Sequence, residues 1–134
     1  MSKQHQTLCL PSDPKNVSKV EPFVESVFKE YQLSPDIYGN ILISLTEAVT
    51  NAIMHGNKSD TSKVVRVQTR LLQSQMAFFI SDEGGGFDVD TLPDPTAPEN
   101  LLKIGGRGVF LMQQLSDDVV FHDDGRTIEI KFNI

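Results

Sequence analysis

Glu47, Asn51 and His55 stand four residues apart in residues 46–56, a stretch whose other positions are largely apolar. On a helix this spacing places the three side chains on one face. A carboxylate that is buried without a partner destabilises a protein, so this face does not point into an apolar core. This row of three side chains therefore belongs either to an ordinary solvated helix face or to a ligand site. The spacing alone does not decide between the two.

A second candidate group follows an apolar segment that ends at Asp82. Gly84, Gly85 and Gly86 come directly afterwards, which is more glycine than a turn requires. Glycine lets the backbone approach a ligand closely. The Asp82 carboxylate acts only as a hydrogen-bond acceptor and suits an exocyclic amine such as that of adenine. The alternative is a simple glycine-rich turn, and the three glycines favour function.

A third group is the sequence GGRGVFLM at residues 105–112, where glycines lead into an apolar helical start. The N-terminus of a helix offers unpaired N–H groups and a dipole that favours an anion. The stretch lacks the Gly-Lys-Ser/Thr of a Walker loop. It also lacks the preceding strand of a dinucleotide-binding fingerprint. Alone, it indicates an anion site only weakly.

The elements that must hold these groups can be predicted from periodicity and from cap residues. We expect strands at residues 6–11, 63–72, 75–84, 118–123 and 127–134, and helices at residues 12–33, 34–57 and from residue 105. Pro22 either kinks the first helix or marks its start. Ser34 is expected to cap the second helix. Residues 88–104 contain three prolines without a periodic pattern, which predicts a functional loop or a disordered segment.

This order of elements predicts a single α+β domain over residues 1–134. We expect a two-layer α/β sandwich, with about three helices on one face of a five-stranded, mixed but mainly antiparallel sheet.

Composition narrows the class of protein. The net charge of −6 and the lack of any Lys or Arg cluster argue against direct binding of nucleic acid. A single cysteine, Cys9, excludes an intramolecular disulfide. The N-terminus does not read as a signal peptide, and no apolar run is long enough to cross a membrane. These features together predict a cytoplasmic protein.

The three groups are more specific in combination than singly, because they occur in a fixed order. The chain resembles the GHKL ATPase superfamily, which includes gyrase-type topoisomerases, histidine kinases and mismatch-repair ATPases. EAVTNAIMHGN at residues 47–57 resembles its N box, DEGGGF at 82–87 its first glycine box, and GGRGVFLM its second. DGRTIEIKF at residues 124–132 is similar to its final box. Within this superfamily the chain is most similar to the small bacterial serine-protein kinases that act as anti-sigma factors.

The resemblance implies a role for each matching residue. Glu47 would be the catalytic general base, Asn51 would coordinate Mg²⁺, and Asp82 would accept a hydrogen bond from adenine. Residues 88–104 would form the ATP lid. The residues implied to bind ATP are Asn51, Asp82, Gly84, Gly86, Gly106, Arg107, Gly108, Val109, Phe110 and Thr127. His55 would have a structural, hydrogen-bonding role at the helix end.

Two functions remain open. The resemblance implies a Mg-ATP-dependent kinase that phosphorylates a serine on a small anti-sigma factor antagonist and holds a sigma factor, regulating transcription through partner switching. The alternative is a nucleotide-responsive protein-binding module with little or no kinase activity. Glu47 favours the enzyme, because a pure binder needs no base at that position. Similar proteins form homodimers, and Phe23, Val27 and Phe28 are apolar candidates for such a contact; the alternative is that all three belong to the core.

Overall fold

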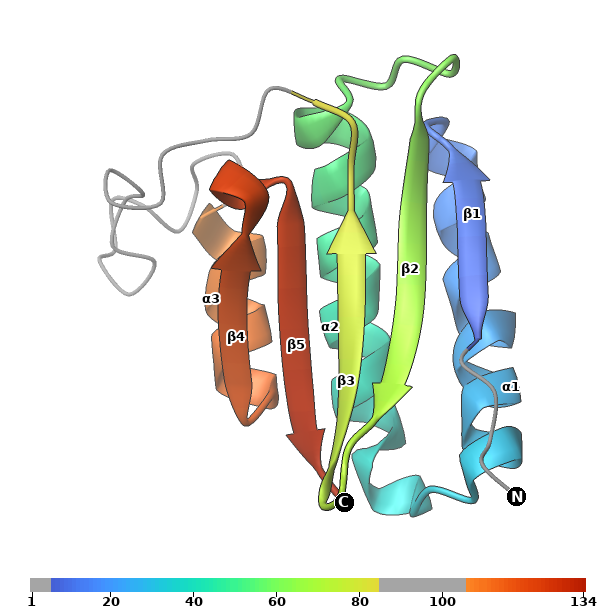
Figure 1. Cartoon of the computed structure of the whole chain (residues 1–134). Helices are drawn as coiled ribbons and strands as arrows, with labels where there is room; N and C mark the ends of the chain where they lie inside the picture. The colour runs from blue at the N-terminus through green and yellow to red at the C-terminus, as the bar shows by residue number, and fades with distance from the viewer. Residues whose placement is uncertain (1–5, 85–105) are drawn as a thin grey trace.

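The computed structural model describes residues 6–84 and 106–134, and the remaining residues lie outside the described part. Within the described part, five strands form one sheet, and three α-helices cover one of its faces (Figure 1). The predicted two-layer α+β sandwich is therefore confirmed. In chain order the elements are β1 (Thr7–Pro11), α1 (Val20–Tyr31), α2 (Tyr38–Asn51), β2 (Val64–Leu71), β3 (Gln75–Ser81), α3 (Gly106–Leu115), β4 (Asp118–His122) and β5 (Thr127–Asn133).

The strands are arranged in the order β1-β2-β3-β5-β4. All of the pairings between described strands are antiparallel, so the parallel pair that a mixed sheet requires does not occur among them. The last strand along the sequence, β5, lies between β3 and β4 (Figure 1). Ser81 pairs with Thr127, which brings the end of β3 and the start of β5 to the same end of the sheet.

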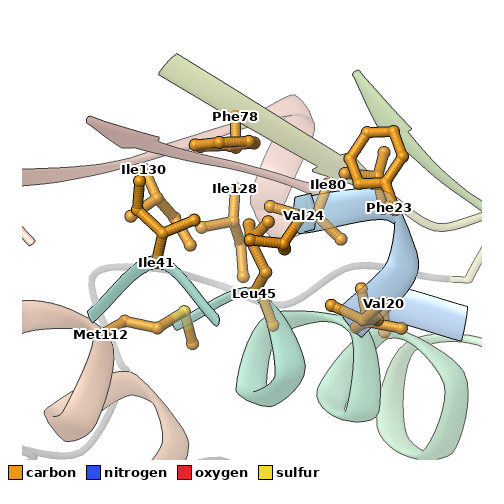
Figure 2. Packing of buried hydrophobic residues seen from close by; sticks show 14 of the residues in the cluster. Val20, Phe23, Val24, Ile41, Leu45, Phe78, Ile80, Met112, Ile128 and Ile130 are labelled. Carbon is orange, nitrogen blue, oxygen red and sulfur yellow. The ribbon is translucent and has the colours of Figure 1, made fainter. Parts of the chain in front are cut away.

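The core lies between the sheet and the helices. Leu45, Val49 and Ile53 lie on the inner face of the helical segment, and all three are fully buried. Figure 2 shows Ile41 and Leu45 of α2 close to Ile128 and Ile130 of β5. Burial of each such side chain stabilises the fold by about 1.5–3 kcal/mol. This packing fixes which face of α2 is turned away from the core.

The first two helical segments begin as the sequence predicts. Each opens with a 3₁₀ turn, at Pro14–Lys19 and Pro35–Ile37, with proline in its first position. Asp13 and Ser34 cap these turns by accepting hydrogen bonds from Lys15 N (3.1 Å) and Asp36 N (3.2 Å). Pro22 falls in the first turn of α1, where its missing N–H breaks no helical bond.

The residues proposed for a homodimer contact are part of the protomer's own core. Phe23 is 9% exposed and Val27 is fully buried, so the prediction that they form a surface contact is wrong. Phe28 packs edge-to-face on Tyr38, with ring centroids 5.2 Å apart. An amphipathic pattern shows that one face is buried, but it does not identify the surface that covers this face.

None of the helices in residues 6–84 and 106–134 combines the length and the apolar character that crossing a bilayer requires.

Candidate functional site

Two polar side chains of α2 meet the first turn of α3. Glu47 and Asn51 are both half-buried, and Gly108 is buried beside them. A Cβ atom on Gly108 would lie 2.7 Å from Asn51 Nδ2 and 3.2 Å from Glu47 Oε2. The structure thus brings together Glu47, Asn51 and Gly108, which the sequence places in two separate motifs. Glycine at position 108 leaves the room that the two side chains occupy.

This meeting point suits a phosphate with a metal ion. α3 begins at Gly106, so the backbone N–H groups of its first turn have no partner within the helix. Among the described residues, no group of three or more His, Cys, Asp or Glu side chains is arranged to hold a metal. Mg²⁺ prefers oxygen ligands and is commonly held by one or two protein side chains together with substrate phosphates. The Asn51 amide oxygen fits that donor set, which leaves the Glu47 carboxylate free for another role.

A second cluster surrounds Asp82, directly after β3. Gly84 N donates a hydrogen bond to Asp82 Oδ1 (2.8 Å), and Asp82 N donates to Arg126 O (2.9 Å). A Cβ atom on Gly56 would collide with the Asp82 carboxylate, and one on Gly84 would lie 2.6 Å from the Gly56 carbonyl carbon. No described residue donates a hydrogen bond to Asp82 Oδ2. Within residues 6–84 and 106–134, Gly84 N is thus the one hydrogen-bond donor to this carboxylate.

Burial raises the pKa of Asp82, although the Gly84 N–H and the positive charges of Arg126 and Lys63 act in the opposite direction. The pKa is therefore higher in the folded than in the unfolded chain, so ionisation of Asp82 destabilises the fold. This destabilisation is absent below the unfolded pKa of about 4. It grows as the pH rises through the folded pKa and is complete above it.

Asp82→Asn removes the ionisable group and keeps an oxygen that accepts from Gly84. We expect the nucleotide-free variant to be at least as stable as the wild type at pH 7. The advantage should shrink towards pH 4, because a protonated Asp resembles Asn. Urea unfolding at both pH values measures this difference, with the exposed Asp36→Asn as the control. A variant that is clearly less stable than the wild type at pH 7 would contradict the expectation.

α2 ends in a π-helical turn at Ala52–Gly56, which the sequence analysis did not predict. Single π turns are often found at functional sites. This turn contains His55, whose exposed side chain makes no hydrogen bond with the described residues, so the helix-end bond expected for it is not seen there. Partial burial lowers the pKa of His55. The row predicted from the spacing thus reduces to Glu47 and Asn51.

Thr127 lies at the same end of the sheet but has other partners. Its Oγ1 donates to Asp123 Oδ2 (2.9 Å) and is 3.1 Å from Ser81 Oγ. Side chains alternate along a strand, and Ile128 belongs to the core beneath the helices. Thr127 therefore belongs to the sheet face opposite α2, and its role in binding ATP stays a prediction.

The other predicted residues differ in how much the structure describes. Gly106 and Arg107 open α3, and Val109 is buried while Phe110 is half-buried. Gly86 and the predicted lid, residues 88–104, lie outside the described residues. Asn57 is not among the predicted site residues, although it is only 1% exposed and bonds to the residue after Asp82. Its only signal was a polar residue after a helix-ending glycine, which is common at helix ends.

Residues 10–132 match the histidine kinase-like ATPase domain. The chain belongs to this family. The histidine kinase-like ATPase assignment confirms the resemblance on which the predicted site depends, and membership in an ATPase family implies that ATP is used.

Curated relatives of this histidine kinase-like ATPase carry a kinase name. The chain is 27% identical to the serine-protein kinase RsbW of Listeria innocua over 129 residues, which cover 91% of this chain and 82% of the relative. It is 30% identical to the serine-protein kinase RsbW of Staphylococcus aureus (strain JH9) over 129 residues, or 90% of this chain and 81% of the relative. Both matches extend over most of each protein, so the similarity is not confined to short motifs.

Proposed function

We propose that the protein is a cytoplasmic Mg-ATP-dependent serine-protein kinase that phosphorylates a small anti-sigma antagonist and holds a sigma factor, so that phosphorylation selects the partner. The observation that carries the proposal is the meeting of Glu47 and Asn51 with Gly108, at the start of α3. The relatives named serine-protein kinase support the same activity. In this proposal the adenine lies at Asp82 and the phosphates lie at the N-terminus of α3.

Each polar group then has one task. Glu47 would orient the hydroxyl of the substrate serine and accept its proton as the serine oxygen bonds to the γ-phosphorus and ADP leaves. Asn51 would hold Mg²⁺, which offsets the negative charge of the phosphates when it is bound with ATP. The backbone N–H groups at the start of α3 would bind the phosphates. A protein that only bound nucleotide would not need the Glu47 carboxylate at this point, which favours the kinase over a pure binding module.

Nucleotide binding tests the first part of this proposal. We expect the protein to bind ATP and ADP in the presence of Mg²⁺ and to prefer them over GTP, because Asp82 accepts from an amine and would repel a carbonyl. Asp82→Asn should lower the affinity for ATP by roughly 1.5–3 kcal/mol, the contribution of one hydrogen bond to a charged group. Isothermal titration calorimetry measures the change, with Asp36→Asn as a charge-matched control. An unchanged ATP affinity in Asp82→Asn would show that Asp82 does not bind the adenine.

A further inference from the structure

Asn57 comes directly after the π turn of α2, and the structure fixes its backbone on both sides. Asn57 N donates to Ala52 O (2.8 Å), and Asn57 O accepts from Asp60 N (3.0 Å). The residue is 1% exposed. A buried amide without partners would destabilise the fold, so the contacts of its side chain explain why a polar residue stands here.

The Asn57 side chain joins three segments that are far apart in the sequence. Its Oδ1 accepts from Glu83 N (2.7 Å), and its Nδ2 donates to Val64 O (3.0 Å) and Ser12 Oγ (2.8 Å). The orientation of the amide is determined, because a backbone N–H only donates and a carbonyl only accepts. Ser12 uses its own hydrogen on Lys63 O (2.9 Å), so it accepts from Asn57.

These bonds act on the position of Asp82. Glu83 N belongs to the peptide group that directly follows Asp82, and this group is held by Asn57. The Glu83 side chain adds a second hydrogen bond to the same segment, since its Oε2 accepts from Val64 N (2.6 Å). On the other side of Asn57 is Gly56, whose backbone fits closely against both Asp82 and Gly84. Asn57 therefore links the end of α2 to the turn that carries the acceptor.

We propose that Asn57 is the positioning residue of the base site, the surroundings of Asp82 where the adenine would bind. It sets the place of the Asp82 carboxylate relative to the end of α2, and the preference for adenine over guanine depends on it. This inference rests on the proposed nucleotide site. Asn57 does not itself touch the nucleotide. Asparagine suits the position because it offers one acceptor and two donors at the same distance from the backbone. Aspartate would lose both donors and bring its charge against Val64 O.

The test compares Asn57→Ala with Asn16→Ala, in the full chain. Asn16 is also a buried amide, 7% exposed, and its Nδ2 donates to Pro11 O (2.9 Å), but it has no bond to residues 82–84. Both variants should lower the melting temperature. Only Asn57→Ala should lower ATP affinity, by about tenfold, and narrow the ratio of ATP to GTP affinity. Calorimetry below the melting range, with folding checked by circular dichroism, gives these values.

A double-mutant cycle separates positioning from a merely structural role. If Asn57 acts through Asp82, Asn57→Ala should cause little further loss of ATP affinity in the Asp82→Asn background. Additive losses, or an unchanged ATP-to-GTP ratio in Asn57→Ala, would overturn the inference. If Asn57→Ala does not fold, Ser12→Ala decides in its place. It removes one partner of Nδ2 and should narrow the ratio by roughly two- to tenfold, whereas an unchanged ratio would overturn the inference.

Failure of the proposed function gives a different result. Wild-type protein that binds no adenine nucleotide would overturn the proposed function and this inference together. Wild-type binding that is lost in Asp82→Asn but unchanged in Asn57→Ala would overturn this inference alone.

Discussion

Glu47→Ala is expected to bind Mg-ATP with near wild-type affinity and to lose phosphotransfer by about 10²–10⁴-fold, the usual contribution of a positioned base. The reason is the place of the carboxylate at the meeting of α2 and α3, 3.2 Å from where a Cβ of Gly108 would be. Asn51→Ala, one helical turn further on, should weaken Mg-ATP binding itself. Comparison of the two variants would therefore separate the chemical step from nucleotide binding.

The substrate for this measurement is the small protein that co-purifies with the wild-type chain from native cells. Transfer of the γ-phosphate to it is followed in a single turnover at saturating ATP, and calorimetry gives the affinity of each variant. Glu30→Ala is the control, because it removes an exposed glutamate from α1. A Glu47→Ala variant that transfers phosphate at the wild-type rate would remove the base role and favour the nucleotide-responsive binding module.

Gly84→Ala is expected to reduce ATP affinity by about 10- to 10²-fold. The added Cβ would lie 2.6 Å from the Gly56 carbonyl carbon and 3.1 Å from Asp82 Oδ1. The backbone at the end of α2 and the turn after β3 would have to separate. Such overpacking destabilises by about 1–3 kcal/mol. The displaced Asp82 would also lose a charged hydrogen bond to the adenine, and this loss lowers the ATP affinity by roughly 1.5–3 kcal/mol.

Gly39→Ala is the matched control, because its Cβ would meet nothing within 4 Å. Gly39 lies near the start of α2, where alanine is the better helix former. The substitution should raise the free energy of unfolding by a few tenths to about 1 kcal/mol and leave ATP affinity unchanged. Chemical denaturation and calorimetry measure both quantities. Equal ATP affinities of the Gly84 and Gly39 variants would show that the close contact with Gly56 has no role in binding.

The fold could be predicted from local patterns because each element carries its own signal. Cap residues such as Ser34, prolines at helix starts and alternating apolar residues located the helices and strands. Strand direction has no such signal, since it depends on pairing between distant segments. The expected mixed sheet therefore proved to have only antiparallel pairings among its described strands. For the same reason the sequence left the apolar face of α1 open between a dimer contact and the core, and the structure places Phe23 and Val27 in the core.

The candidate site was predictable in part. The shared face of Glu47 and Asn51 follows from helix geometry. The glycines of the two later motifs suggest close approach of the backbone to a ligand. The π turn after Asn51 has no residue signature, so His55 was placed in the same row. The face that Thr127 occupies depends on its register with Ser81, across the β3–β5 pair. The role of Asn57 depends on contacts with residues 26 and 45 positions away in the sequence, at Glu83 and Ser12.

The place of β5 between β3 and β4 has a consequence for synthesis on the ribosome. β3 is made early, but one of its two neighbours in the sheet is the last strand along the sequence. Until residues 127–133 have emerged, β4 lacks the strand with which it pairs, and the edge of β3 that pairs with β5 is open. A nascent chain in this state has an incomplete base site and an open strand edge. On the proposed function, the adenine site at Asp82 is therefore complete only after β5 has been inserted between β3 and β4.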